Sequence, residues 1–273
     1  MLASTLHLFS RKIPMTRAAS DWCGNILAFG LTIVVNAMAT SIPLGGKTPP
    51  EISAQYPSLF TPAGFTFSIW GIIYLGLLLF IIYQALPGQR DNAVLARISV
   101  PFKISCIANA AWILAWHYDF LFLSVLIMLC ILVTLIAIYS ALDSEHATAP
   151  RAERFLVHLP FRLYTAWICV ASIANISTVQ TAMNWDNIGT DAITWTLLKL
   201  ALAGTIGASV IARKGDVAFI LVVAWAAFGI SVKQIETPAV AGAALSLCML
   251  AVMLAVFAGI RQLYFRLHSS RED

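Results

Sequence analysis

Long, nearly uninterrupted runs of apolar residues divide this chain. A helix needs about 20 mostly apolar residues to cross a bilayer, so each run predicts a transmembrane helix. The runs are continuous and do not alternate between apolar and polar residues, which favours helices over barrel strands. The third run is short and ends directly before the fourth, which predicts a tight hairpin between them. The eight expected spans are 22–43, 65–86, 101–117, 120–141, 160–180, 192–212, 215–232 and 238–260, of which the seventh is marginal in length.

The amino-acid composition indicates that much of the protein surface is in contact with a lipid bilayer and not with water. Apolar residues form 60% of the chain and charged residues 11%, against roughly a quarter charged in soluble proteins. A soluble fold of this size would need a polar coat that this chain cannot supply. No dense basic cluster is present, so nucleic acid is not an expected partner. We also expect the first span to remain as an uncleaved helix.

Basic residues fall mainly on one side of this eight-span arrangement. That side collects 14 of the 16 Lys and Arg residues outside the helix interiors, and the other side holds only Lys47 and Lys233. Basic loops stay in the cytoplasm, so both termini are predicted to be cytoplasmic and the first loop external. The 14 residues are Arg11, Lys12, Arg17, Arg90, Arg97, Lys103, Arg151, Arg154, Arg162, Arg213, Lys214, Arg261, Arg266 and Arg271.

The external loop at 44–64 is rich in proline and glycine, which argues against a helix there. It also carries apolar residues, namely Ile52, Tyr56, Leu59 and Phe60. A loop of this length with apolar anchors is expected to pack on something, for instance as a lid. A plain connection along the membrane interface would fit the same residues.

Three spans carry aromatic or polar residues at spacings of three and four, which place each set on one helix face. Indole and phenol rings provide flat surfaces with one polar handle each, which suits a planar or steroid-like ligand. Core packing and an interfacial aromatic belt are the alternatives. The expected pocket residues are Phe67, Trp70 and Tyr74; Asn109, Trp112 and Trp116; and Tyr164, Trp167, Ala171 and Asn175.

These motifs resemble the tryptophan-rich sensory protein family, also called TspO/MBR or translocator protein. Trp70 followed by Tyr74 after a proline-rich loop is similar to the start of the family's second helix. Asn109 with Trp112 resembles its third-helix Asn-x-x-Trp. Tyr164-Thr165-Ala166-Trp167, with Ala171 and Asn175 following, resembles its fifth helix. Ser68, Leu114 and Leu163 stand where the family often has proline.

The resemblance covers 22–180 and implies an all-α membrane protein whose first five helices form a TspO/MBR-like bundle. It implies a pocket for porphyrins, sterols or similar hydrophobic molecules, a role in sensing or transport, and often a homodimer. No cofactor is required, although a porphyrin or haem-like ligand would fit. The expected divisions are a cytoplasmic segment at 1–21, the bundle at 22–180, three additional helices at 181–260 and a cytoplasmic tail at 261–273.

Lys199 is the one basic residue deep inside a predicted span, and an intramembrane charge is a functional candidate. Its expected partners are Asp186, Asp191 or Glu236, or it could snorkel to the interface. This residue, with Asn36, supports a second hypothesis, an ion-coupled transporter of a small solute. The same added helices carry small residues that predict close helix packing, namely Gly204, Gly207 and Ala208, and Ala239, Gly242 and Ala243.

Catalytic and metal-binding residues are not expected. No set of His, Cys, Asp or Glu falls together inside the spans, and no histidine has a metal-ligand partner at helical spacing. The five cysteines lie within or at the ends of apolar stretches without a CxxC pair. They are interpreted as small buried hydrophobes and not as a disulfide framework.

Overall fold

The computed structural model describes residues 17–42, 46–146, 148–185 and 188–269, and within these ranges the chain is helical without strands. The predicted all-α class is therefore confirmed for the described residues. The long helices are α1 (Ala19–Ser41), α3 (Ile69–Ala85), α4 (Ala93–His117), α5 (Leu121–Asp143), α7 (Leu159–Ala182), α8 (Ala192–Lys214), α9 (Val217–Lys233) and α10 (Pro238–Ser269). The short ones are α2 (Pro49–Gln55), α6 (Arg151–Glu153), the 3₁₀ turns η2 (Gly64–Ser68) and η3 (Pro87–Gln89), and the π-helical turn η4 (Arg154–His158).

Seven described helices are long and apolar enough to cross a membrane, and α9 is a shorter apolar helix of 17 residues. Helix α9 occupies the expected seventh span. At 1.5 Å per residue it is roughly 25 Å long, slightly less than a hydrocarbon core of about 30 Å. The multi-pass membrane architecture is thus confirmed, and the eighth crossing depends on this short helix.

The third span is longer than expected because α4 begins at Ala93 and not at Pro101. The side chain of Asn92 caps this start by accepting the backbone N–H groups of Val94 and Leu95, at 3.0 and 3.2 Å. Pro101 lies inside the helix. The predicted start was too late because Arg97 and Pro101 interrupt the apolar run near the beginning of this helix. Residues 117–121 form the tight connection to α5 that was predicted.

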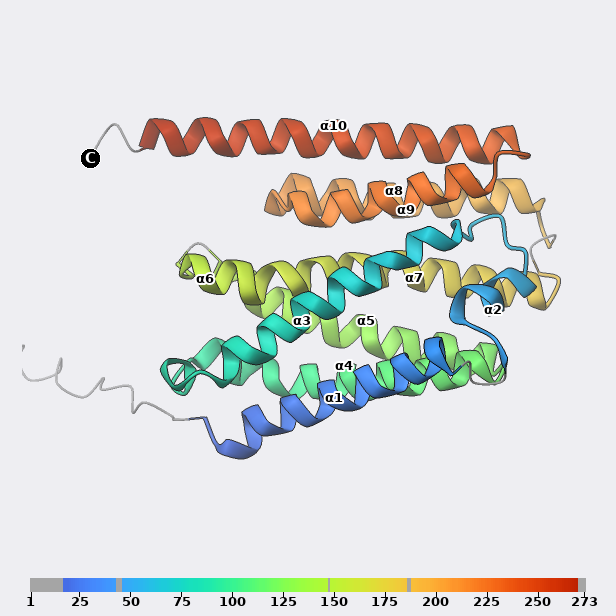
Figure 1. The fold of residues 1–273 in the computed structure, drawn as a ribbon. Helices are drawn as coiled ribbons and strands as arrows, with labels where there is room; N and C mark the ends of the chain where they lie inside the picture. Colours follow the sequence, from blue (N-terminus) through green and yellow to red (C-terminus); the bar gives the residue numbers. More distant parts are fainter. Residues whose placement is uncertain (1–16, 43–45, 147, 186–187, 270–273) are drawn as a thin grey trace, which may run out of the picture.

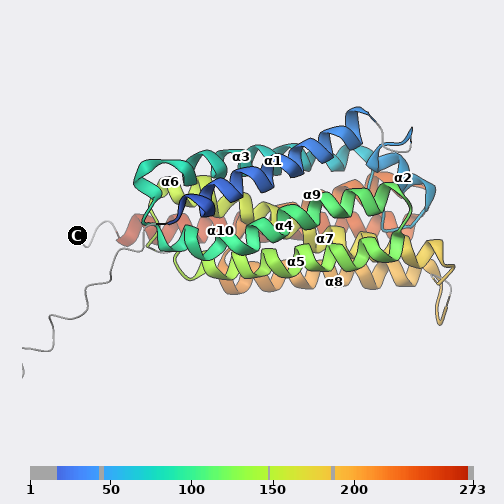
Figure 2. The same cartoon turned by 90° about the horizontal axis from the view of Figure 1, so that it is seen from below.

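Helices α1, α3, α4, α5 and α7 surround a common interior (Figures 1 and 2). Helix α4 packs between α1 and α5, and α5 packs against α7. Buried aromatic rings fill the inner half of this bundle. Phe80, Phe102 and Phe161 contact one another edge to face, with ring centroids 5.0 to 5.7 Å apart.

Helices α8, α9 and α10 form an added layer on the α7 side of the bundle (Figure 1). Helix α9 contacts α7, α8 and α10. Small residues allow the close approach: a methyl group on Gly207 would overlap Ile220 of α9, and one on Gly204 would press on Leu247 of α10. The predicted packing role of these two glycines is confirmed. The same prediction was wrong for Gly242, because a methyl group there would meet nothing within 4 Å.

The outer connection between α1 and α3 contains a helix, which corrects the expectation that its prolines and glycines exclude one. Pro49 and Pro50 stand at the first two positions of α2, where proline's missing N–H is harmless. Thr48 and Glu51 form a reciprocal capping box across its first turn. The Thr-Pro-Pro-Glu sequence is therefore the start of a helix, which was not predicted.

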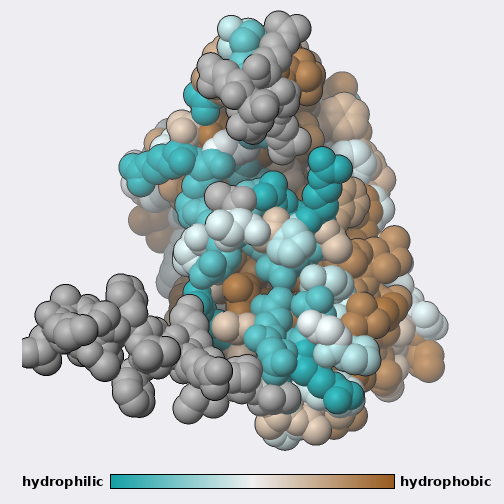
Figure 3. Space-filling view, turned by 90° about the vertical axis from the view of Figure 1, so that its left-hand side faces the viewer, coloured by the Kyte–Doolittle hydropathy of each residue, from teal (hydrophilic) through white to brown (hydrophobic). Residues whose placement is uncertain are grey.

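The described basic residues of the predicted cytoplasmic side lie at one end of the bundle, where α1 begins and α10 ends. Figure 3 looks onto this end and shows hydrophilic residues across it with hydrophobic residues on its flank. Buried polar contacts join the helices here: Asp216 caps α9, accepts a hydrogen bond from Tyr139 at 2.7 Å and lies 3.4 Å from Arg162. Arg11, Lys12 and Arg271 lie outside the described residues.

The cysteines are all free thiols. Only Cys106 is buried in the protein; Cys130 is exposed and the other three are half-buried. The expectation of five buried cysteines was therefore wrong in detail, because apolar residues of a membrane helix can face lipid instead of the protein interior.

Candidate functional site

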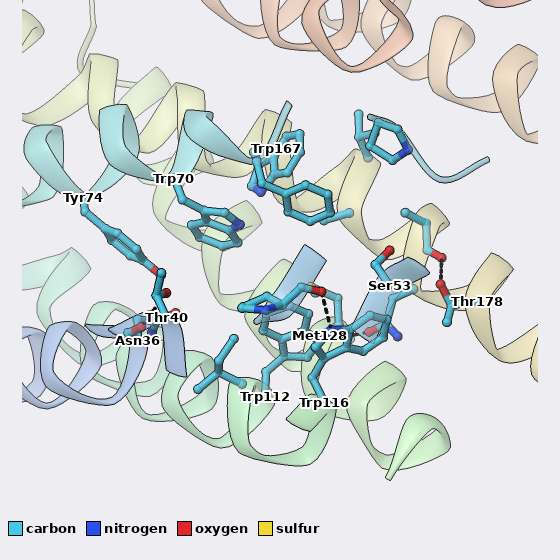
Figure 4. A pocket seen from close by; sticks show the side chains of 18 of the residues that line it. Asn36, Thr40, Ser53, Trp70, Tyr74, Trp112, Trp116, Met128, Trp167 and Thr178 are labelled. Atoms are coloured by element: carbon cyan, nitrogen blue, oxygen red, sulfur yellow. Dashed lines mark hydrogen bonds between the residues drawn. The ribbon is translucent and has the colours of Figure 1, made fainter. Parts of the chain in front are cut away.

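A cavity of about 420 Å³ lies among the halves of α1, α3, α4 and α7 that are nearer α2, with α2 at its end (Figure 4). This volume is within the ~300–1,000 Å³ typical of small-molecule sites. Of the ten predicted pocket residues, eight line it. The lining residues include Ile33, Asn36, Ala37, Thr40, Pro49, Ser53, Phe60, Phe67, Trp70, Gly71, Tyr74, Trp112, Trp116, Met128, Trp167, Ala171, Asn175, Thr178 and Ile230.

Two groups of rings face each other across the cavity in Figure 4, one from α3 and α7 and one from α4. On the first side, Trp70 stacks on Tyr74 at 5.3 Å and meets Trp167 edge to face at 6.2 Å. On the second, Trp112 and Trp116 stack at 5.6 Å. Because the aromatic residues of each helix are three or four positions apart, their rings lie on one helix face, which points into the cavity.

Asn109 and Tyr164 lie next to the cavity instead of lining it, and their hydrogen bonds connect four helices, α1, α3, α4 and α7. The Asn109 oxygen accepts a hydrogen bond from Asn36 of α1 at 2.8 Å and faces the Tyr74 hydroxyl at 3.5 Å. Its amide donates to the Tyr164 hydroxyl at 3.0 Å. All four side chains thus support one another, so Asn109 braces the bundle.

Asn175 lines the cavity but is also used within the protein. Its oxygen accepts a hydrogen bond from the Trp112 indole at 3.0 Å, and its amide donates to Ser124 of α5 at 2.9 Å. This contact fixes the plane of the Trp112 ring. Both asparagines therefore brace helices.

Trp167 differs from Trp112 because its indole N–H has no hydrogen-bond partner among the described residues. The residue is 3% exposed. An unsatisfied buried donor costs about 1–3 kcal/mol. Such a group next to a cavity is suited to an acceptor on a bound molecule.

The outer segment between α1 and α3 forms a roof over the cavity, as the lid interpretation expected. The Trp116 indole donates to the Pro49 carbonyl at 3.4 Å, and the Tyr56 hydroxyl to Asp119 at 3.2 Å. The hydroxyls of Ser58 and Ser177 are 2.5 Å apart. Ile52 and Phe60, at 2% and 0% exposure, anchor the segment.

Two ionisable groups of this roof have pKa values that are shifted in opposite directions. Hydrogen bonds from the Thr48 backbone and hydroxyl lower the pKa of Glu51. Burial, together with the charge of Asp119 and a hydrogen bond to it, raises the pKa of Tyr56. At neutral pH Glu51 is therefore a carboxylate that caps α2, and Tyr56 is a neutral donor.

The cavity also has walls that the sequence did not point to. Helix α1 supplies Ile33, Asn36 and Thr40, and α9 supplies Ile230. The spacing of Thr32, Asn36 and Thr40 along an otherwise apolar helix was a usable signal for α1. No local pattern marks Ile230, because its position depends on the packing of α9.

The α9 wall meets the bundle through Thr66 of η2. A methyl group on Gly229 would overlap the Thr66 side chain. The backbone N–H of Ala63 donates to the Gly229 carbonyl at 3.0 Å, and the Trp225 indole donates to the Thr66 carbonyl at 2.9 Å. Helix α9 is thereby fixed against the segment that begins α3.

Lys199 lies elsewhere, in a second groove, and its ammonium group donates to the Ser177 hydroxyl at 2.7 Å. The structure places Lys199 and Asn36 in different cavities. Asp186, one of its expected partners, lies outside the described residues. No group of three or more His, Cys, Asp or Glu side chains that could hold a metal ion is found among the described residues.

Comparison with known proteins gives one match. A family model described as TSPO-like protein matches residues 21–257, which extend from the start of α1 into α10. No curated protein and no solved structure matches this chain.

Proposed function

Because this chain belongs to the TSPO-like protein family, we propose that it binds a hydrophobic or planar molecule in the aromatic cavity. The ligand class is porphyrin-, sterol- or isoprenoid-like, and the role is that of a sensor or transporter and not of an enzyme. The observation that carries this proposal is the convergence of the aromatic faces of α3, α4 and α7 on one cavity.

The cavity's lining restricts the ligand further. None of the described lining residues is charged. An ionised group moved into such surroundings would lose its hydration without gaining a partner. The lining therefore favours a neutral ligand, or a planar one whose charged groups remain at the opening.

An opening between α1 and α3 fits this ligand class. Ala37, Thr40 and Gly71 line the cavity and are also exposed. A molecule dissolved in the bilayer could enter there without passing through water. The unpartnered indole N–H of Trp167 would then hold a carbonyl, hydroxyl or ring nitrogen of the ligand.

The proposal includes an orientation. Eight helices cross the membrane, both termini are cytoplasmic, and α2 covers the cavity on the outer side. Residues 22–180 form the ligand-binding bundle, and 181–260 form an added layer that closes its wall with Ile230. The uneven distribution of Lys and Arg between the two ends supports this orientation.

Titration of the purified protein with protoporphyrin IX and with its neutral dimethyl ester tests the ligand class. We expect saturable quenching of tryptophan fluorescence, with the ester bound at least as tightly as the diacid. Binding should be lost in Trp112→Ala and Trp167→Ala. It should persist in Trp22→Ala, a matched control near the start of α1. Equal loss in all three variants would contradict the proposal.

A further inference from the structure

Two indole rings of the aromatic cavity carry N–H groups that the protein does not use. Among the described residues, no side chain or carbonyl accepts a hydrogen bond from the indole of Trp70 or from that of Trp167. The two rings meet edge to face, with centroids 6.2 Å apart and an interplanar angle of 85°. Both stand on the same side of the cavity in Figure 4. Two hydrogen-bond donors therefore lie close together on one wall.

The two tryptophans on the opposite wall differ, because their N–H groups have partners. Trp112 donates to Asn175 at 3.0 Å, and Trp116 donates to the Pro49 carbonyl at 3.4 Å. Their rings stack with centroids 5.6 Å apart. The cavity thus combines a wall of flat rings with a wall that donates hydrogen bonds.

A third unused donor lies at the end of the cavity that α2 forms. Ser53 is 7% exposed and lines the cavity, and its hydroxyl has no hydrogen bond to a described residue. A helical serine often donates to the carbonyl four residues earlier, as Ser172 does to Ile168 at 2.7 Å. The carbonyl four residues before Ser53 is that of Pro49, which accepts the Trp116 indole instead. The Ser53 hydroxyl is therefore available to a bound molecule.

We propose that the cavity binds a prenylated 1,4-quinone and prefers the oxidised quinone to the reduced hydroquinone. This inference rests on the proposed function and specifies its ligand class. A quinone ring is flat and neutral, and its two carbonyl oxygens accept hydrogen bonds without donating any. One oxygen accepts from Trp70 and Trp167, and the opposite one accepts from Ser53. The ring lies against the stacked indoles of Trp112 and Trp116.

The prenyl chain of this ligand leaves through the opening between α1 and α3. Ala37, Thr40 and Gly71 line the cavity and are exposed at that opening. Lipid tails are as apolar as leucine, so the chain gains little from the protein that the bilayer does not also supply. Recognition therefore depends on the head group and on the donors around it.

Reduction of the ligand changes how well it matches these donors. Two electrons and two protons convert both carbonyl groups to hydroxyls, which bring two donors of their own into the cavity. Among the described lining residues, the one amide oxygen without a partner is that of Asn36, whose nitrogen donates to Thr32 and Asn109 at 2.9 and 2.8 Å. A buried donor without an acceptor lowers affinity. The hydroquinone therefore binds more weakly, and the protein distinguishes the two forms without transferring electrons.

Isothermal titration of the full-length protein in detergent with ubiquinone that carries one isoprene unit tests this proposal. The matched ligands are its hydroquinone, kept reduced without oxygen, and prenylbenzene, which lacks the oxygens. We expect one quinone per chain, bound about tenfold more tightly than either matched ligand, since one hydrogen bond is worth about that factor.

Variants that keep the shape of the cavity identify the donors. Trp70→Phe, Trp167→Phe and Ser53→Ala should each weaken quinone binding and leave prenylbenzene binding unchanged. Trp22→Phe, near the start of α1, and Ser246→Ala, exposed on α10, are the matched controls and should bind quinone as the wild type does. Thermal unfolding of each variant verifies that it is folded.

Three outcomes would overturn the proposal: hydroquinone or prenylbenzene that binds as tightly as the quinone, quinone binding that is unchanged in all three donor variants, or no quinone binding at all. Titration with protoporphyrin dimethyl ester distinguishes this failure from failure of the proposed function. If the ester binds and the quinone does not, the quinone assignment alone is wrong. If neither binds, both proposals are wrong.

Discussion

Buried polar groups near the cavity differ in whether they have hydrogen-bond partners within the protein. Asn109 and Asn175 each use both the oxygen and the nitrogen of the amide in hydrogen bonds to other side chains, whereas the Trp167 indole N–H has no partner among the described residues. Removing the amide of either asparagine should lower stability, and removing the indole N–H of Trp167 should not. Ligand affinity should depend more on the Trp167 N–H than on the two amides.

Trp167→Phe should therefore weaken binding only of ligands that carry a hydrogen-bond acceptor. The ring remains, and the lost hydrogen bond is worth about 1.4 kcal/mol, or roughly tenfold in affinity. Isothermal titration with a ketone-bearing ligand and its hydrocarbon analogue measures this difference. A similar loss for both ligands would mean that the ring, and not its N–H, makes the contact. Thermal stability should stay the same or rise.

His146 provides a residue-level pH dependence at the inner end. Burial, followed by the charges of Arg162 and His158, lowers its pKa from 6.5 to about 4. Its Nδ1 lies 3.0 Å from Nδ1 of His158, so one imidazole donates to the other. As pH falls, His146 is protonated at a higher pH in the unfolded chain than in the folded protein. The stability of the folded state should therefore decrease as pH falls from about 6.5 to 4.

His146→Gln should flatten that decrease, since glutamine does not titrate. Unfolding of the detergent-solubilised protein, followed by circular dichroism at pH 7 and 5, provides the measurement. His268→Gln is the matched control, because that histidine is exposed near the end of α10. An equal pH dependence in His146→Gln and in the wild type would exclude His146 as the cause.

At the residue scale, the sequence was most informative where periodicity applies. Trp70, Trp112 and Trp167 face one cavity because spacings of three and four fix a helix face. The same rule could not separate Asn109 and Tyr164, which brace the cavity, from the residues that line it. That distinction depends on which helix lies opposite, and this is a property of the tertiary packing.

Among the elements, the roof helix α2 is held by its N-terminal cap. Glu51→Ala removes the capping carboxylate and should speed amide hydrogen exchange across residues 49–55, with faster ligand release from the cavity. Glu236→Ala, at the outer end between α9 and α10, is the matched control. Unchanged exchange in Glu51→Ala would show that tertiary contacts alone hold the roof.

The same contact gives the wild-type roof a pH dependence. The pKa of Glu51 is lowered below its ordinary value of 4.5 on folding, so its stabilising effect is present above that value. It should be lost as pH falls further, through the folded-state pKa. Exchange in α2 should then approach that of Glu51→Ala.

Element boundaries were harder to predict than element existence. Arg97 and Pro101 interrupt the apolar run at the beginning of α4 and hid its start, although the Asn92 cap was a readable signal. The π-helical turn at Arg154–His158 adds a residue to a helical turn directly before α7, which breaks the periodicity and leaves only the part from 160 onwards as a regular pattern. Helix α2 was missed because proline was interpreted as a breaker and not as a first-turn residue.

For the whole molecule, the seam between α9 and η2 joins the added layer to the cavity. Gly229→Ala should force Thr66 away, destabilise the protein by about 1–3 kcal/mol and weaken ligand binding through the displaced wall. Gly242→Ala is the matched control, since a methyl group there meets nothing within 4 Å, and it should be neutral or slightly stabilising. Thermal unfolding and ligand titration of both variants test this. Equal behaviour would show that the seam is adaptable.

Whether α9 crosses the membrane decides the relative location of the two termini. With eight crossings, green fluorescent protein fused after residue 273 should fluoresce, and alkaline phosphatase fused after residue 235 should be active. Seven crossings with a cytoplasmic N-terminus would place the C-terminus outside and make the first fusion dark. A fusion after residue 90 is the cytoplasmic control.

The global fold followed from the sequence because hydropathy reports directly on the membrane environment. Seven long spans and the sidedness of the basic residues required no knowledge of contacts. The placement of α8, α9 and α10 did require it: nothing in the sequence indicated that Ile230 would reach the cavity or that Gly229 would meet Thr66.

The position of α9 has a consequence for how the protein responds to lipid. Neighbouring helices cover most of this short element and leave Leu221, Phe228 and Val232 exposed. Its ends are satisfied by protein: Asp216 by Tyr139 and Arg162, and Gln234 by carbonyls of the roof segment. Its length therefore need not match the bilayer. Thicker or thinner membranes will tilt the peripheral helices first, while the wall beside the cavity keeps its register. The proposed ligand binding at that wall should thus depend little on membrane composition.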